Sequence, residues 1–528
     1  MTRVHALTGK PLNGKSVNGR AREEVLTAFE RIRQGRTAKL SIDAARSGTD
    51  LDSHWRHADS LSPDESYSKT VRHTLIKRSR YEASSNGYYS GICETHSNML
   101  CGVGPTLRML TGNRNFNQLV EREFFAWMQA VQLRRKIWCM SHARTADGES
   151  FGVFQTNPGI ANDVQLDIML IEAEQCQTPY LESFEAGRID GIRYDEFNNV
   201  VQYDILPRHP GSSFYSLETP ISVSASNVVH WFKMKRAGAH RGIPSLTSTL
   251  NCGAYGRRHR EAVVAAAESA ADHAAIAKTN MQAGGADEID QVAPFTGIDT
   301  VKRQLTFLPY GWDLTQLRSE HPNAQYNDFQ RSIISEQARP ISMPYNAAAC
   351  DSSTYSFASG KLDTLCYRSA LDVERQDCND LVLDKIFAAW FREWTVVANR
   401  RDIPPAHQWD WPAHPVIDAV AEASAIDTKL KNSTITLRQV YSDAGMDLED
   451  QLSIMAEDWF GEATEETIVK ARNICILKTT PAPAMQAVSA ILGVQATSQQ
   501  PQPADANEVT GEFQAIRNRI THLESIQR

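Results

Sequence analysis

The first residues that could carry chemistry are Gly9–Ser16, which spell a phosphate-binding Walker A motif, G-x-x-x-x-G-K-S. A working site of this kind needs a buried strand before the glycines and a helix that starts at the lysine and serine, so that backbone N–H groups surround the phosphates. Only Val4–Leu7 precedes the motif here, and Asn18-Gly19 would end a helix at once. We therefore expect residues 1–63 to form an N-terminal arm and not a nucleotide site.

A serine-hydrolase motif, G-x-S-x-G, occurs at Gly148–Gly152. A nucleophilic serine of that class sits on a sharp turn between a hydrophobic strand and a helix. Asp147-Gly148 instead separates two strand-like runs, Ile137–Ser141 and Phe151–Gln155, which is typical of a β-hairpin. The motif therefore predicts a turn and not a nucleophile.

Cysteine and histidine occur at partial metal-binding spacing in Cys93-x-x-His96 and in Cys139-x-x-His142. A zinc site needs a second pair of ligands, and neither motif has one close by in the sequence. The nine cysteines are scattered and odd in number, which is typical of reduced intracellular thiols. We expect no metal, no cofactor and no catalytic residue.

Composition narrows the class of protein. A chain of 528 residues is too long for one simple core, and its length suggests about three domains. The formal net charge is −8, with acidic and basic residues intermixed, which argues against a basic clamp for nucleic acid. No apolar run reaches the roughly 18 residues of a membrane span, so no membrane contact is expected.

The rest of the chain is arranged around residues 241–383. An alanine-rich helix is predicted over Leu246–Thr279. Glycine and proline then divide 283–323 into short apolar pieces, and a second helix follows at Ala324–Arg339. After a loop at 340–353, a long helix is predicted over Tyr355–Trp394. This order suits two helices that carry a small domain at their tips, followed by a loop and a return helix.

On either side of this unit the periodicity predicts a mixture of helices and strands. The face Arg72, Lys77, Arg78 and Arg80 of the first predicted helix is expected to be solvated. Trp409-Asp410-Trp411-Pro412 indicates a boundary. The predicted helices are 64–100, 117–131, 416–431, 437–443, 447–459 and a tail helix at 511–527, and the predicted strands are 106–110, 164–171, 191–194, 200–205 and 227–232.

Several short stretches, in order and at consistent spacing, resemble the portal proteins of tailed bacteriophages, specifically the lambda-type family. The similar stretches are Ile42–Ala45 with Trp55, Arg78–Arg80, Gly102–Gly104, Gly148-Glu149, Val228–Phe232, Arg241–Leu246, Tyr355-Ser356 and Ala444–Asp447. The sequence departs from the family pattern at Phe357–Gly360, where the family usually has a serine and then an arginine, and at Pro309–Gly311, an altered Pro-Gly turn.

The resemblance implies an α+β portal fold with a mixed wing, a helical stem, a small α/β clip and a helical crown. The implied domains are an N-terminal arm (1–63), wing (64–240), stem helix (241–280), clip (281–323), second stem helix (324–339), tunnel loop (340–353), return helix and wing (354–412), crown (413–480), and linker with tail helix (481–528).

The resemblance also implies a function. About twelve subunits would form a ring at one capsid vertex of the virion, after synthesis in the cytoplasm of the bacterial host. Double-stranded DNA would pass through the ring during packaging and ejection, with weak and non-specific contacts. The implied protein partners are the terminase large subunit, head-completion or adaptor proteins, and the major capsid or scaffold protein.

Two groups of residues are expected to serve that function. After Pro340 and Pro344 the loop is small and polar, without lysine or arginine, so it would line a channel and not grip phosphates. Its candidate DNA-facing residues are Ser342, Asn346, Asp351, Ser352 and Ser353. The candidate terminase-docking residues of the clip are Asp299, Lys302, Arg303 and Trp312.

Two alternatives remain open from the sequence. One is a P-loop ATPase of the packaging motor that uses Lys15, Ser16 and the acidic Glu172 at the end of a core strand. The other is an adaptor or scaffold protein of the virion that forms no channel.

Overall fold

The computed structural model describes residues 58–178, 187–213, 218–272, 276–279, 312–315, 326–400, 404–414 and 418–480. The chain divides into two compact units, Met1–Ser62 and Pro63–Arg528, and every element below belongs to the second. The Walker A motif Gly9–Ser16 and the predicted tail helix at 511–527 lie outside the described residues.

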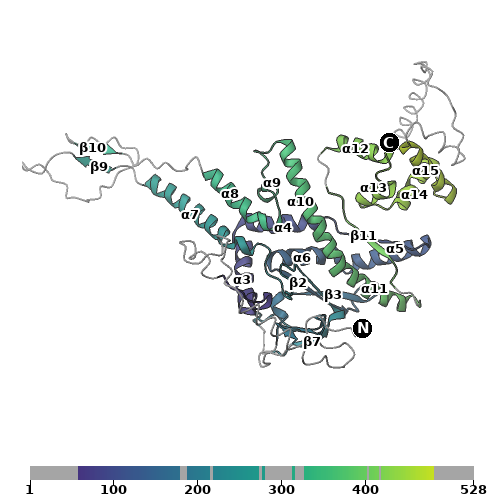
Figure 1. Ribbon diagram of the computed structural model, residues 1–528, viewed down its shortest axis with the longest axis horizontal. Helices are drawn as coiled ribbons and strands as arrows, with labels where there is room; N and C mark the ends of the chain where they lie inside the picture. Colours follow the sequence, from purple (N-terminus) through teal and green to yellow (C-terminus); the bar gives the residue numbers. More distant parts are fainter. Residues whose placement is uncertain are drawn as a thin grey trace, which may run out of the picture. The chain divides into compact units, whose positions relative to one another are not determined.

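The central sheet has three antiparallel strands in the order β3-β2-β8, of which β2 and β3 are labelled in Figure 1. β2 (Glu149–Thr156) pairs with β3 (Leu166–Ile171) on one side and with β8 (Val228–Phe232) on the other. Because side chains alternate along a strand, Phe151 and Val153 enter one hydrophobic core while Phe154 packs against another. Both faces of the sheet are therefore covered.

Helices cover one face and form the largest core. They are α4 (Gly87–Cys101), α5 (Arg114–Ala130), α6 (Leu133–Ala146) and one long helix that comprises α10 (Phe357–Cys378), a π-helical segment η7 (Asn379–Leu383) and α11 (Asp384–Val397). Aromatic rings fill the space between α5 and α11. Phe124 meets Trp390 edge-on, with ring centres 5.0 Å apart.

A second, four-stranded antiparallel sheet lies over the other face. Its order is β4-β5-β6-β7, for strands Arg188–Ile189, Ile192–Tyr194, Val200–Ile205 and Ile221–Ser224. The 3-10 turns η3 (Ala173–Gln175) and η4 (Ala225–Asn227) flank it. β5 and β6 confirm the strands predicted over 191–194 and 200–205, and the two strands pair with each other.

The predicted helix over 64–100 is three helices in the structure: α2 (Pro63–Ser66), α3 (Lys69–Ser85) and α4. Asn86 breaks it, and its side chain accepts a hydrogen bond from Tyr88 N, which caps the first turn of α4. α4 ends as predicted before Gly102, which has a φ of 51°. β1 (Thr106–Met109) then pairs with β11 (His407–Asp410), so Trp409-Asp410 is part of a strand and not simply a boundary.

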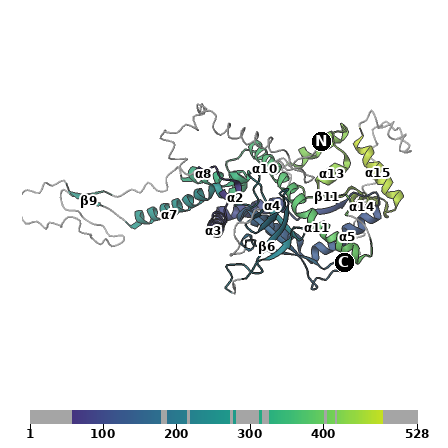
Figure 2. The same ribbon diagram turned by 60° about the horizontal axis from the view of Figure 1, so that its bottom comes forward.

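The region from 247 to 338 has the predicted order of helix, strand-containing block and helix. A 3-10 turn η5 (Thr247–Thr249) leads into α7 (Leu250–Asp272), and β9 (Ile276–Thr279) pairs with β10 (Trp312–Thr315) before α8 (Tyr326–Ala338) (Figure 2). α7 packs on α8, and a β-carbon at Gly256 would lie 3.0 Å from Ile333 Cγ2. The alanine-rich helix ends seven residues earlier than expected, because its last residues belong to β9.

The segment predicted as a loop over 340–353 is partly helical. A 3-10 turn η6 (Arg339–Ile341) precedes a short helix, α9 (Tyr345–Ala349). Pro344 supplies the N-cap position, and the alanines that follow favour a helix. The prolines therefore end α8 as expected, but they do not prevent a new turn of helix.

Four further helices follow β11: α12 (Ala419–Lys431), α13 (Leu437–Asp443), α14 (Leu448–Phe460) and α15 (Glu465–Thr479). They have a small core of their own that includes Leu452, Ala456 and Ala471. The first three confirm predicted helices.

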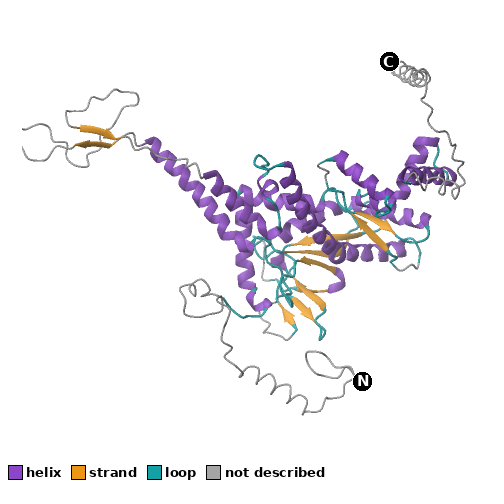
Figure 3. Ribbon diagram, turned by 45° about the horizontal axis from the view of Figure 1, so that its top comes forward, coloured by secondary structure: helices purple, strands orange, loops and turns teal. Residues whose placement is uncertain are grey.

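One predicted strand was wrong. The run Ile137–Ser141 belongs to helix α6, not to a strand, so no hairpin precedes β2. Its buried residues Leu133, Ile137, Met140, Ser141 and Arg144 recur every three or four positions, which is a helical period. The predicted α+β class is confirmed (Figure 3). No helix of the described residues is both long and apolar enough to cross a bilayer.

Candidate functional site

The serine of the G-x-S-x-G motif is not placed for catalysis. Ser150 lies inside β2, is 3% exposed and pairs with Trp231 of β8. The element before it is a helix and the element that contains it is a strand, which reverses the order that a nucleophile elbow needs.

The two Cys-x-x-His motifs hold no metal-ligand group. Both ring nitrogens of His96 are engaged, since Nδ1 lies 3.0 Å from the Tyr367 hydroxyl and Nε2 lies 3.0 Å from Glu374 Oε2. Burial raises the pKa of the Cys93 thiol to about 12, so this thiol stays protonated. His142 stacks on Trp138.

Within the described part of the chain, one group has metal-like spacing: Glu172, Glu174 and His209. His209 Nδ1 accepts a hydrogen bond from the backbone N–H of Gly211 at 3.0 Å, so in the neutral ring Nε2 carries the proton. Nε2 lies 3.2 Å from Glu172 Oε2, and Arg80 Nη1 lies 3.0 Å from the same oxygen. Arg80 already pairs with both carboxylates, so we interpret this group as an ion-pair cluster.

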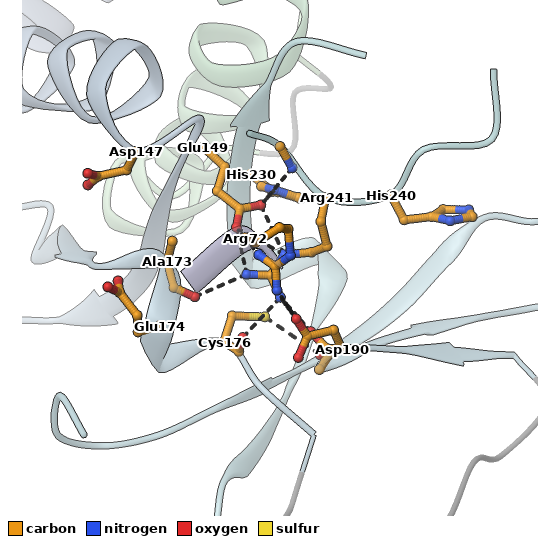
Figure 4. Close-up of polar contacts among 12 residues, drawn as sticks. Arg72, Asp147, Glu149, Ala173, Glu174, Cys176, Asp190, His230, His240 and Arg241 are labelled. Atoms are coloured by element: carbon orange, nitrogen blue, oxygen red, sulfur yellow. Dashed lines mark hydrogen bonds and ion pairs between the residues drawn. The ribbon is translucent and has the colours of Figure 1, made fainter. Parts of the chain in front are cut away.

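A buried group of charged side chains joins the sheet to the segment that leads into α7. Glu149, at the start of β2, is 1% exposed. Its carboxylate accepts hydrogen bonds from Arg72 Nη1 of α3 at 2.8 Å and from Arg241 Nη2 at 2.7 Å (Figure 4). His230 Nε2 of β8 and the Gly242 N–H each lie 3.1 Å from Oε2. We call Arg72, Glu149, His230 and Arg241 the Glu149 cluster.

The charges of the Glu149 cluster determine its protonation. Burial disfavours the Glu149 anion, but the Arg241 and Arg72 charges outweigh burial and hold its pKa well below 4.5. Burial lowers the pKa of Arg72 to about 10, which leaves it charged at neutral pH. Burial also lowers the pKa of His230, so the ring is neutral and donates from Nε2. Two buried cations therefore face the buried Glu149 carboxylate and, at the edge of the cluster, the Asp190 carboxylate, which pairs with both Arg72 and Arg241.

The prediction for Arg72 was wrong. It was expected on a solvated basic face, but its side chain is buried and the residue is only 1% exposed. It shares its side of α3 with the buried residues Ile76 and Ser79, at helical spacing, and that spacing was the missed signal. Of the same predicted face, Lys77 and Arg78 are exposed, as expected. Arg80 is half-buried against Asp147, with Nε 2.8 Å from Oδ1.

Two glycines allow the backbone around the Glu149 cluster to close. Gly148 has a φ of +97°, and a β-carbon there would lie 2.0 Å from the carbonyl carbon of Ile243. A β-carbon at Gly242 would lie 2.1 Å from the Gly148 oxygen. Side chains at either position would separate the α6–β2 turn from the segment that leads to α7.

A second buried carboxylate ties α10 to α4 and α6. Glu374 Oε2 lies 2.8 Å from Arg144 Nη1 and 3.0 Å from His96 Nε2, while Oε1 lies 3.0 Å from Lys233 Nζ. Burial would raise the pKa of Glu374, but its hydrogen bond to His96 and the nearby cations lower it. The long return helix is therefore fixed by charge as well as by its aromatic core.

The candidate residues of the 340–353 segment differ in exposure. Ser342, Ser352 and Ser353 are exposed, whereas Asn346 and Asp351 are half-buried. Ile341, Met343 and Ala348 anchor the segment in the main core. Asp351 Oδ1 accepts the Ser353 N–H at 2.9 Å, so Asp351 shapes the turn.

Most of the candidate terminase-docking residues lie outside the part of the chain that the structure describes. Asp299, Lys302 and Arg303 lie outside the described residues, and Trp312 is placed only by its backbone, which opens β10. The structure therefore neither brings these four residues together nor separates them.

A cavity of about 310 Å³ lies between β1, α5 and the start of α14. Glu121 of α5 faces it and accepts the Met109 N–H at 2.6 Å. Burial, with the nearby carboxylates of Asp447 and Asp450, raises the pKa of Glu121 to about 7. Between about pH 4.5 and pH 7, Glu121 therefore keeps its proton in the folded protein and loses it in the unfolded chain.

We predict that Glu121→Gln raises the thermal midpoint at pH 8 and not at pH 5. A raised carboxyl pKa makes stability fall as the pH rises from about 4.5 to about 7. Glutamine removes the buried charge and can still accept the Met109 hydrogen bond. Thermal unfolding at both pH values checks this, with Glu123→Gln on the same helix, where the side chain is 40% exposed, as the control. Equal shifts at the two pH values would contradict the assignment.

With this geometry in place, the chain can be compared with known proteins. The sequence profile of the phage portal proteins of the lambda family matches residues 49–375, well over half of the chain. The chain belongs to the lambda family of phage portal proteins, and it is therefore a structural protein of the virion capsid and not an enzyme. A search of curated proteins gives no match.

Solved structures include distant likenesses. A chain in the neck of an empty gene transfer agent particle, computed with C6 symmetry, matches with a TM-score of 0.42 at 10% identity, over 71% of this chain and 93% of that one. A chain of the native gene transfer agent virion matches with a TM-score of 0.40, and one from the native neck, computed with C12 symmetry, with 0.36. Both also have 10% identity and cover the same shares of the two chains.

Proposed function

We propose that this protein forms a ring of about twelve subunits at one vertex of a phage capsid, through which double-stranded DNA is packaged and ejected. The observation that carries this proposal is membership in the portal family over residues 49–375. We further propose that the protein is made in the cytoplasm of a bacterial host before the capsid assembles.

In this proposal the domains have the bounds expected from the sequence. Residues 64–240 and 354–412 are the wing. Residues 241–280 and 324–339, which contain α7 and α8, are the stem. Residues 281–323 are the clip, 340–353 the tunnel loop and 413–480 the crown. The clip would dock the terminase large subunit, through Asp299, Lys302, Arg303 and Trp312, and later the head-completion proteins. Contacts with the major capsid or scaffold protein would hold the ring at the vertex.

Exposed apolar side chains support assembly with further copies. On α7, Tyr255 is 66% exposed and Val264 is 56% exposed, and on α10 Leu362 is 62% and Val373 is 64% exposed. Neighbouring subunits of a ring would cover such exposed apolar side chains on α7 and α10. A cyclic assembly supplies the same neighbour to every copy.

The net charge of the chain favours a channel that lets DNA pass, and disfavours a site that binds DNA tightly. At −8 for each chain, a ring of about twelve copies carries about one hundred negative charges, which repel phosphates. Each phosphate contact adds salt-dependent affinity, and a channel that passes DNA must keep such contacts few. The absence of lysine and arginine between Pro340 and Tyr355 agrees with that requirement.

We predict that Ser352→Lys combined with Ser353→Lys slows DNA packaging at low salt. Both serines are exposed, and the substitutions keep the backbone hydrogen bond from the Ser353 N–H to Asp351 Oδ1. Lysines in the bore would bind passing phosphates, and added salt would screen them and restore part of the rate. The measurement is the packaging rate into purified procapsids, at low and at high salt.

The matched control adds the same charge on the β2–β3 loop, as Ala161→Lys with Gln165→Lys, at exposed positions. We expect this control to package at the normal rate. A normal rate for the serine variant at low salt would place the 340–353 segment away from the DNA.

A further inference from the structure

One arginine of α8 lies between two tyrosines that bracket the segment 345–355. The Arg331 guanidinium carbon is 4.9 Å from the ring centre of Tyr345 and 5.8 Å from that of Tyr355. Tyr345 opens α9, and Tyr355 directly precedes Ser356, the N-cap of α10. A cation between two aromatic faces is attracted to both. We call Arg331, Tyr345 and Tyr355 the Arg331 clamp.

The segment between the two tyrosines has a turn structure of its own. The Tyr345 hydroxyl donates to Asp351 Oδ2 at 3.4 Å, and the Tyr355 N–H donates to the Ser352 oxygen at 3.1 Å. Together with the Asp351–Ser353 contact, these bonds hold 345–355 as one unit. Arg331 then connects both ends of that unit to α8.

α8 also packs directly against α7. Ile333, two residues after Arg331, is 8% exposed and packs against Gly256 of α7. The far ends of α7 and α8 lead into the paired strands β9 and β10. A shift of α8 relative to α7 would therefore move Arg331 away from two rings at once.

We propose that the Arg331 clamp couples the position of α8 to the order of the segment 345–355, so that a displacement of α8 releases that segment. The inference rests on the proposed function, in which this segment lines the DNA channel and the two helices carry the docking clip. A motor or adaptor that binds at the β9–β10 end and shifts α8 would then change the bore of the channel.

The first test measures backbone hydrogen exchange in the purified full-length protein. Arg331→Ala should speed exchange of the amides in 345–355 about tenfold, since two cation–π contacts are lost. Exchange in α8 itself should be unchanged. Arg339→Ala, which removes an exposed arginine of η6 outside the clamp, is the control and should have no effect.

Tyrosine variants separate the ring from its hydroxyl. Tyr355→Phe keeps the aromatic face and should leave exchange in 345–355 near the wild-type rate, whereas Tyr355→Leu should speed it as Arg331→Ala does. The clamp is disproved if Arg331→Ala leaves exchange in 345–355 unchanged. It is equally disproved if exchange rises by the same factor throughout α8, because that result indicates general loss of stability.

The second test addresses coupling. Gly256→Ala places a methyl group 3.0 Å from Ile333 Cγ2, so the Ile333 side chain on α8 must give way by a few tenths of an ångström. We expect this variant to speed exchange in 345–355 when Arg331 is present and to add nothing in the Arg331→Ala background. No effect with Arg331 present, or the same effect in both backgrounds, would overturn the coupling.

These exchange measurements use protein without DNA or motor, so their outcome does not depend on the channel. Failure of the channel proposal would appear instead in the packaging assay with the serine-to-lysine variant. The two proposals can therefore fail separately.

Discussion

Glu149→Gln should reduce the stability of the unit around the central sheet by about 3 kcal/mol, because two buried arginines lose their buried anion and keep only the Asp190 carboxylate at the edge of the cluster. Arg72 is 1% exposed and Arg241 is 4% exposed, so water cannot replace the carboxylate. Glutamine has the same shape, which excludes a cavity as the cause of any loss. The measurement is the urea midpoint followed by fluorescence of the buried tryptophans.

The matched control for this prediction is Glu172→Gln. Glu172 also pairs with an arginine, but its side chain is 55% exposed and Arg80 keeps the carboxylates of Asp147 and Glu174. Its loss should cost less than about 1 kcal/mol. Similar midpoints for the two variants would show that the Glu149 cluster is not a stabilising joint.

The pH dependence of this contribution has a definite sign. The pKa of Glu149 is depressed below its usual 4.5, so its contribution is fully present above that pH. The contribution declines only as the pH falls through the depressed value. The difference in stability between wild type and Glu149→Gln should therefore be constant from pH 6 to pH 8, unlike the difference produced by Glu121→Gln.

Gly148→Ala should be comparably damaging, because the new β-carbon would lie 2.0 Å from the carbonyl carbon of Ile243. Backbone atoms on both sides prevent a simple side-chain adjustment, and the φ of +97° strains any L-residue. We expect little folded protein, or a thermal midpoint lowered by at least about 5 °C. Circular dichroism melts of the purified protein check this.

Gly91→Ala is the control for backbone effects. Gly91 lies in α4 with no heavy atom within 4 Å of the added carbon. Alanine is the better helix former, so this variant should gain roughly 0.5–1 kcal/mol. If Gly148→Ala behaved like Gly91→Ala, the close approach between the α6–β2 turn and the segment leading to α7 would be refuted.

Periodic elements could be predicted from the sequence because their signals are local. The pairing of β5 with β6, the limits of α13 and the order of helix, interrupted block and helix from α7 to α8 follow from turn residues and hydrophobic spacing. β9 does not, since its residues were predicted as the end of the alanine-rich helix. α6 could not be distinguished in this way, since a short run such as Ile137–Ser141 suits a strand or a helix. Its fold depends on packing against α4 and β2.

The buried clusters were beyond prediction from local pattern because their members are distant in the sequence. Glu149, His230 and Arg241 lie on different segments and meet only when β2 pairs with β8. Arg72 carries a helical signal that places it beside Ile76, yet nothing local says which anion it meets. The Arg331 clamp could not be predicted for the same reason, because its two tyrosines lie on either side of a turn and meet Arg331 of α8 only in the folded chain.

The structure describes the candidate residues of the 340–353 segment more fully than those of the clip. For the loop, the structure places Ser352 and Ser353 on the surface and shows that Asp351 has a local structural task. For the clip, residues 299, 302 and 303 fall outside the description, so their role rests on the family alone. Substitutions in the loop are therefore the more informative ones to make first.

The measurement that tests the account most directly is electron microscopy of the purified full-length protein, followed by localisation of the protein on assembled capsids. The account predicts rings of about twelve subunits with an open central channel, present at a single vertex of each capsid. A protein that stays monomeric at micromolar concentration, together with capsids that carry no such ring, would contradict the proposal that this chain is the channel for DNA.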